Sequence, residues 1–267
     1  MMTSDKILNR QSNKRISTVQ NKAFSRKLYL IISLILLADF SLFISIELND
    51  SVIFVLALVP LLIALFFSSA VASFSREVEI IQTGKFLSII AAFTFVSVSL
   101  PSFGDAYIDI LVIAILFFVA LLLSGVSFVD RLPHKLLVVV IALVVGIVFG
   151  IIGSYALSGT ITRVIRKDLF LPLLPIAFLF GYMEEVFFRS GLQKSLEPIS
   201  SRIQAIVFPA LLDAGLNALW SSTEFCIIVF VLAVIMGVLY SKFHFVTLNG
   251  ISRSVESGLV IGLAIFF

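Results

Sequence analysis

Nine runs of predominantly apolar residues constrain the fold of this chain more than any other feature, because most are long enough to cross a bilayer. A helix needs about 20 apolar residues to span about 30 Å of hydrocarbon. The runs lie at 28–46, 52–74, 86–100, 106–128, 136–157, 169–196, 201–220, 225–241 and 246–267. We predict an all-α, polytopic transmembrane helical bundle of eight to nine spans, in which the short run at 86–100 is the doubtful one. The composition agrees, since 60% of residues are hydrophobic and only 13% are charged.

The distribution of positive charge predicts how the chain is oriented. Seven of the nineteen Lys and Arg residues lie in the polar segment 1–27. By the positive-inside rule this segment is a mobile cytosolic tail, and we expect a protein of the cell membrane whose N-terminus is cytoplasmic. The net charge of +3 is then a topology and lipid-headgroup signal, and we expect no nucleic-acid partner. One segment, 160–168, opposes this topology because its three basic residues would face outward; it is either an interfacial amphipathic segment or a sign that one upstream span is miscounted.

The apolar run at 169–196 contains two carboxylates and a guanidinium, at Glu184, Glu185 and Arg189. Ionisable residues inside a membrane span are functional-site candidates. Glu185 and Arg189 are four residues apart and share a helix face, whereas Glu184 points about 100° away from its neighbour. We therefore expect Arg189 to neutralise Glu185 and to leave Glu184 for a pocket.

Two later runs add further polar residues at helical spacing. Asp213 and Asn217 are one turn apart, and Arg253 and Glu256 are three residues apart. Because such groups are unlikely to face lipid, the three helices should turn them toward one shared interior. In the first half we interpret Asp39 and Asp109 as structural or snorkelling acids.

A stripe of small residues at Gly146, Gly150 and Gly153 would let another helix approach closely. That helix belongs either to the same chain or to a second copy, so helix–helix self-association is a possible partner interaction.

The polar residues of the second half resemble a known family. Glu184, Glu185 and Arg189, followed by Ser-Gly-Leu-Gln at 190–193, resemble the first motif of the CPBP (CaaX protease and bacteriocin-processing) intramembrane proteases, which include the type II CaaX prenyl endopeptidases. The resemblance covers about the last third of the chain. It divides the sequence into a basic cytosolic tail at 1–27, N-terminal transmembrane helices at 28–157 and a CPBP-like protease core at 158–267.

The resemblance implies roles for six residues, with departures at three of them. Glu184 occupies the base position, and Glu185 with Arg189 occupies that of the supporting pair. Asn217 and Arg253 stand where the family has its two histidines, and Ser257 stands where it commonly has an asparagine. An amide could orient a water but could not take its proton. A guanidinium could still stabilise an oxyanion.

A metal-dependent or cofactor-dependent mechanism is not expected. No His-Glu-x-x-His motif is present, and the only two histidines, His134 and His244, fall in loops. We interpret both as surface or interface residues, although a shifted alignment would bring His244 toward the site.

Two functions from different classes stay open. The first is a degenerate or weakly active glutamate-dependent endopeptidase that hydrolyses a membrane-anchored peptide or protein. The second is a non-catalytic pseudoprotease, a scaffold, regulator or immunity-type protein that binds a membrane peptide or lipid. Pairing of Arg253 with Glu256 and with Asp213 across the bundle would favour the second, because it would close the former pocket. Proton-coupled transport is less favoured, since no inverted repeat is visible.

Overall fold

The structure is a computed structural model, and it describes residues 26–46, 48–99, 106–126, 136–164, 170–218 and 221–264. Over these ranges the chain is helical and contains no strand. The elements are an N-terminal helix Arg26–Ile46, α2 Ser51–Phe74, α3 Val78–Ser99, α4 Ala106–Ser124, α5 Leu136–Val164, α6 Phe170–Glu185, the π-helix η2 Val186–Gln193, α7 Lys194–Leu196, α8 Arg202–Ala218, α9 Thr223–Phe243 and α10 Val246–Ala264. The predicted all-α bundle is confirmed.

One predicted boundary is wrong, because polar residues belong to the helix. The run expected at 86–100 begins eight residues earlier, at Val78, where Glu79 lies in the first turn of α3. An acid there is favoured by the helix dipole. The hydroxyl of Thr83 donates to the Glu79 carbonyl at 2.8 Å, so a backbone group of the same turn satisfies it.

The span predicted at 136–157 coincides with the apolar segment Leu136–Leu157, and helix α5 itself continues to Val164. The side chains at 158–172, with the charged segment 160–168, lie outside the described residues.

Five of the described helices are long and apolar enough to cross a bilayer: Arg26–Ile46, Ser51–Phe74, Val78–Ser99, Leu136–Leu157 and Thr223–Phe243. Helices α6 and α8 are shorter, with 16 and 17 residues. Helix α10 is continuous, but Arg253 and Glu256 interrupt its apolar sequence. These three helices carry the ionisable residues of the second half, and the apolar part Leu111–Leu122 of α4 is also too short.

The distribution of exposed and buried side chains is that of a protein in lipid. Phe66, Phe74 and Leu136 expose 71%, 85% and 76% of their surface, whereas Arg189 and Arg253 are buried. In water this arrangement would expose apolar surface and bury charge, both at a cost. The chain is therefore an integral membrane protein.

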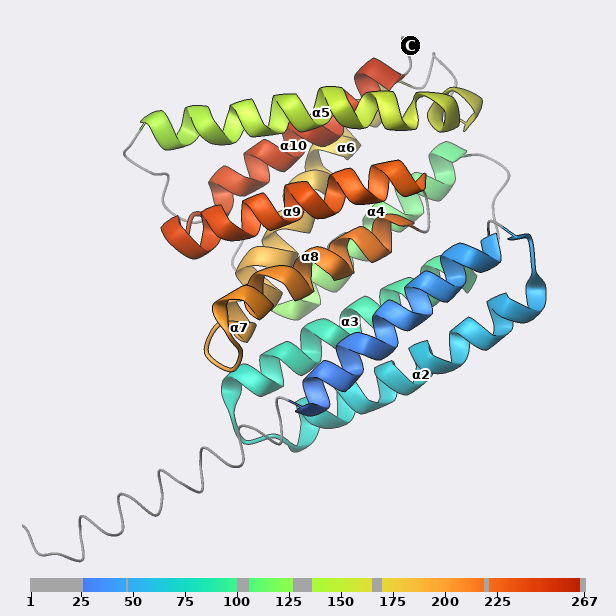
Figure 1. Cartoon of the computed structure of the whole chain (residues 1–267), viewed down its shortest axis with the longest axis vertical. Coiled ribbons are helices and arrows are strands. Elements are labelled where there is room, and N and C mark those ends of the chain that lie inside the picture. The colour runs from blue at the N-terminus through green and yellow to red at the C-terminus, as the bar shows by residue number, and fades with distance from the viewer. Residues whose placement is uncertain are drawn as a thin grey trace, which may run out of the picture.

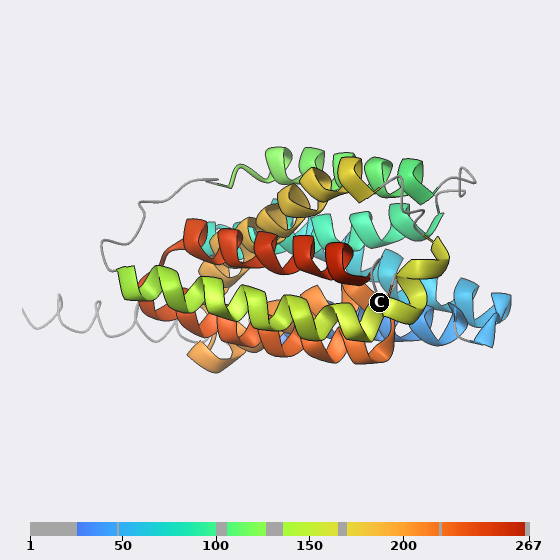
Figure 2. The same ribbon diagram turned by 90° about the horizontal axis from the view of Figure 1, so that it is seen from above.

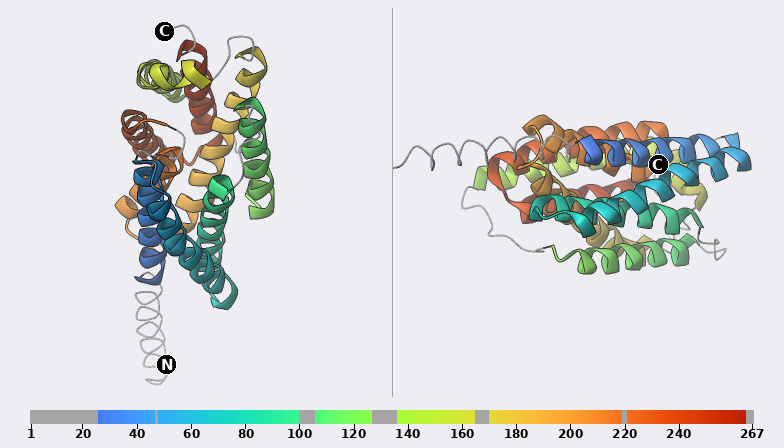
Figure 3. Two further views of the ribbon diagram at one scale, coloured as in Figure 1. Left: turned by 90° about the vertical axis from the view of Figure 1, so that its right-hand side faces the viewer. Right: turned by 90° about the horizontal axis from the view of Figure 1, so that it is seen from below.

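Helix α10 packs against both α5 and α6. Figure 1 shows α5 and α10 at one end of the bundle and the N-terminal helix with α2 and α3 at the other. Helix α4 lies beside α6, as Figures 2 and 3 show. The N-terminal helix contacts α8, where Tyr29 donates to Gln204 at 3.0 Å.

Glycines set the close approach of α10 to its two neighbours. A side chain at Gly146 would collide with the backbone of Ser252, and one at Gly150 would lie 2.7 Å from Leu259. The small-residue stripe thus packs against a helix of the same chain. On the other side of α10, a side chain at Gly181 of α6 would lie 2.7 Å from the carbonyl oxygen of Arg253. This contact places the carboxyl end of α6 beside Arg253.

Candidate functional site

The first ion pair of the site lies where α6 becomes the π-helix η2. Arg189 Nε donates to Glu185 Oε2 at 3.0 Å, and both side chains are buried. The pairing expected from their spacing is present. Arg189 Nη1 also donates to Gln193 Oε1 at 3.4 Å, and the Gln193 amide donates to the carbonyl of Gly237 in α9 at 2.9 Å. The pair therefore ties this segment to α9.

Three helices meet at the guanidinium of Arg253. Glu184 Oε2, at the end of α6, accepts from Arg253 Nε at 3.2 Å and lies 3.1 Å from Nη2. Asp213 Oδ1 in α8 lies 3.6 Å from the same Nη2. Glu256 Oε2, one turn along α10, lies 3.3 Å from Nη1. The expected pairing of Arg253 with Glu256 and Asp213 is present.

The expectation that Glu184 stays free for a pocket is wrong. Arg253 reaches it from α10, and Glu184 is only 6% exposed. The sequence could not show this contact, because the two residues lie on different helices and their approach depends on the glycine contact between α6 and α10.

Asn217 joins the site through its neighbour on α8. Its amide nitrogen donates to the backbone carbonyl of Asp213 at 2.9 Å and to Asp213 Oδ1 at 3.2 Å. The structure records no direct contact between Asn217 and Glu184, both of which it describes. Ser257 donates to Glu256 Oε2 at 3.2 Å. Asp213 and Glu256 therefore belong to the polar centre more directly than Asn217, although sequence reasoning gave them only an ion-pairing role.

The histidine that the structure describes lies apart from this centre. His244 ends α9 in a left-handed conformation with φ 55°, its side chain is exposed, and its ring stacks edge-on against Tyr240. His134 lies outside the described residues. Within the described part of the chain, no group of three or more His, Cys, Asp or Glu side chains is arranged to hold a metal ion.

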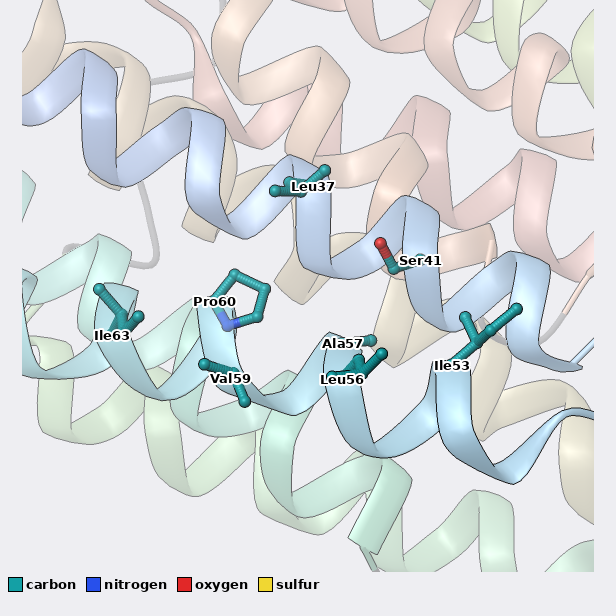
Figure 4. A pocket seen from close by; sticks show the side chains of 8 residues that line it. All are labelled: Leu37, Ser41, Ile53, Leu56, Ala57, Val59, Pro60 and Ile63. Carbon is teal, nitrogen blue, oxygen red and sulfur yellow. The ribbon is translucent and has the colours of Figure 1, made fainter.

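A separate groove of about 370 Å³ lies between the N-terminal helix and α2. Figure 4 shows its lining side chains: Leu37, Ser41, Ile53, Leu56, Ala57, Val59, Pro60 and Ile63. None of these side chains titrates, and the groove is separate from the cluster at Arg253.

A further buried acid, Asp39, faces α8 from the N-terminal helix. It is 2% exposed, and neither carboxyl oxygen has a hydrogen-bond partner. A side chain added at Gly215 would lie 2.7 Å from Asp39 Oδ2, so the glycine makes room for the carboxyl. Asp39 is therefore buried in the bundle and does not snorkel. The side chain of Asp109 lies outside the described residues.

The segment that carries most of this centre matches a family model. Residues 166–249 match the model described as "Rce1-like: Type II CAAX prenyl endopeptidase Rce1-like", and Arg253 and Glu256 lie just beyond the matched range. Neither the comparison with curated proteins nor that with solved structures gave a match. The resemblance drawn from Glu184, Glu185 and Arg189 is confirmed, since the segment that contains them is similar to the Rce1-like type II CAAX prenyl endopeptidases of the CPBP family.

Proposed function

We propose that this protein is a weakly active intramembrane endopeptidase in which Glu184 is the general base. The observation that carries the proposal is the 3.1 Å contact between Glu184 Oε2 and Arg253 Nη2. It joins a carboxylate that can take a proton from water to a guanidinium that can stabilise an oxyanion. The Rce1-like match supports the same class of reaction.

The reaction begins when a peptide carbonyl takes over one of the Arg253 donors that Glu184 holds at rest. Glu184 then accepts a proton from a water molecule as the water oxygen bonds to the carbonyl carbon. Arg253 donates to the oxyanion that forms, and the carbon–nitrogen bond breaks as the nitrogen gains a proton from a buried acid of the cluster. Glu185 and Arg189, joined at 3.0 Å, hold the end of α6 in place during this step.

The replacement of the histidines explains why the activity is weak. Asn217 can orient water through its amide, but it cannot accept the proton. One well-placed acid–base group contributes about 10²–10⁴ in rate. A site that depends on Glu184 alone should be slower by a factor of that order than one in which an imidazole assists.

The substrate class follows from the surroundings of the site. A centre enclosed by membrane helices is reached by a chain that already lies in the bilayer, so we propose a membrane-anchored peptide or protein, prenylated or otherwise lipidated. Membrane lipids are the partners of the apolar exterior. We place the basic tail in the cytoplasm and the protein in the cell membrane, which would put cleavage near the cytosolic face.

The test is cleavage of a prenylated peptide by the full-length protein in reconstituted membranes. Glu184→Gln should abolish cleavage, because the amide cannot accept a proton. Glu79→Gln is the matched control, since Glu79 is exposed in the first turn of α3, and it should leave the rate unchanged. Cleavage that persists in Glu184→Gln excludes Glu184 as the base.

One observation favours the second candidate, a non-catalytic scaffold or regulator. Three carboxylates contact Arg253, and Asp213, Arg253 and Glu256 are each no more than 2% exposed. Such pairing closes the centre. A scaffold would bind the same peptide saturably without cutting it, and Glu184→Gln would remain able to bind. Turnover by the wild-type protein decides against this candidate.

A further inference from the structure

The buried carboxylates of the site outnumber its guanidinium groups. Glu185 and Arg189 form one balanced pair. Around Arg253, however, three carboxylates share one positive charge. If all three were ionised, two negative charges would lack compensation in a water-poor interior. A buried carboxylate whose charge is not compensated binds a proton and becomes a neutral carboxylic acid.

The hydrogen-bond pattern indicates which oxygens hold those protons. Glu184 is the ionised group, since one of its oxygens faces two nitrogens of Arg253, at 3.2 and 3.1 Å. Asp213 lies farthest from the guanidinium, at 3.6 Å. Its Oδ1 accepts from the Asn217 amide, and its Oδ2 is buried without a partner. That pattern fits a neutral carboxylic acid whose Oδ1 is the carbonyl oxygen and whose Oδ2 carries the hydrogen.

Glu256 shows the same pattern on the other side of the guanidinium. Its Oε2 accepts from Ser257 and faces Arg253, while its Oε1 is buried without a partner. With one proton on Asp213 and one on Glu256, the charges of the whole buried cluster sum to zero.

Of the two neutral acids, Asp213 is the one beside Glu184. Both contact the same nitrogen, Arg253 Nη2, whereas Glu256 contacts Nη1. Building on the proposed peptidase function, we propose that Asp213 is the catalytic acid that works with Glu184 as base, and that Asn217 is the residue that positions the Asp213 carboxyl.

The proton that Glu184 accepts and the proton that Asp213 gives up balance over one reaction cycle. Glu184 takes a proton from water as the water oxygen bonds to the carbonyl carbon. Asp213 gives its proton to the leaving nitrogen as the carbon–nitrogen bond breaks. Glu184 is then protonated and Asp213 ionised, and one transfer from Glu184 to Asp213 restores the resting state. The net reaction consumes one water, and the pair supplies the proton donor that the amide of Asn217 cannot be.

The kinetic test compares two neutral isosteres in reconstituted membranes. Asp213→Asn keeps the shape and neutrality of the acid but cannot give up a proton in the same way, so cleavage should fall by about 10²–10⁴. Glu256→Gln removes an equally buried carboxyl that contacts the same arginine, and it should lower the rate of cleavage much less. Equal losses in the two variants would overturn the assignment of Asp213.

An infrared measurement tests the protonation state without relying on cleavage. The wild-type protein should show the carbonyl absorption of protonated carboxylic acids, and Asp213→Asn should remove part of it. Glu184→Gln should instead remove carboxylate absorption. Asn217→Ala should shift the Asp213 band without removing it, because the hydrogen bond to Oδ1 is lost. If Asp213→Asn leaves the protonated-acid absorption unchanged, the proposal is wrong even where the wild type cleaves. If the wild type does not cleave, the proposed function fails on its own.

Discussion

Arg253 is the side chain whose removal should destabilise the fold most, because three buried carboxylates contact it. Arg253→Met should lower the free energy of unfolding by about 3–5 kcal/mol, the usual result of removing one partner of a buried ion pair. Adding Glu184→Gln should recover more of this loss than adding Glu256→Gln, since Glu184 makes the two closest contacts. Denaturant unfolding in detergent micelles measures the free energy of unfolding of the single variant and of the two double variants.

The control for that series is Arg202→Met. Arg202 is exposed and donates to the hydroxyl of Ser241 at 3.0 Å, so its loss should change stability by no more than about 0.5 kcal/mol. A strictly additive effect of Arg253→Met and Glu184→Gln would show that the two groups are not coupled, and would contradict the ion pair.

Residue spacing predicts contacts within a helix and fails between helices. The pairs Glu185–Arg189 and Arg253–Glu256 follow from separations of four and three residues, and both are present. The contact between Glu184 and Arg253 joins residues 69 positions apart. No periodicity contains that information, because it depends on how closely two helix backbones approach.

At the scale of elements, the glycine contact between α6 and α10 controls the position of Glu184. A side chain at Gly181 would lie 2.6 Å from the hydroxyl of Ser257 and 2.7 Å from the Arg253 carbonyl. Gly181→Val should therefore push the helices apart and destabilise the protein by about 1–3 kcal/mol, as overpacking does. Leu179→Val changes an exposed position of the same helix and should have a small effect. Thermal unfolding measures the midpoint temperature of each variant. Equal decreases in Gly181→Val and Leu179→Val would contradict the close packing of α6 and α10.

The apolar runs predict most helices within a few residues, since a bilayer fixes both their length and their composition. The sequence could not predict the π-helix at Val186–Gln193. Its hydrogen-bond pattern depends on the surroundings of the segment, where a side chain at Gly191 would lie 2.5 Å from the ring of Phe86 on α3. Single-turn π-helical insertions occur frequently at functional sites. This longer, eight-residue π-helix begins directly after the two glutamates and contains Arg189.

Across the whole molecule, lipid-facing apolar side chains occur in both halves of the chain, whereas the charged cluster lies in the second half. The N-terminal helix and α2 expose Phe40, Leu56 and Phe66, and the later helices α6 and α9 expose Leu179 and Ile227. Helices α6, α8 and α10 bury the charged cluster. Both halves therefore contact the membrane, and the proposed chemistry belongs to the second half. Helix–helix self-association stays a prediction, and the glycine stripe of α5 on which it was based packs against α10 of the same chain.

Orientation in the membrane is testable because the chain has a single cysteine, Cys226. In a Cys226→Ser background, new cysteines at Ser4, Thr223 and His244 report on the tail and on the two ends of α9. Thr223 and His244 are exposed and separated by the 21 residues of that helix, a rise of about 31 Å that is long enough to cross the hydrocarbon. With nine spans and a cytoplasmic N-terminus, a membrane-impermeant maleimide added to intact cells should label Thr223→Cys. Ser4→Cys and His244→Cys should react only after permeabilisation. Protection of both Ser4→Cys and Thr223→Cys in intact cells would mean that an even number of spans separates them, which would place the basic segment 160–168 on the cytoplasmic side that the positive-inside rule favours.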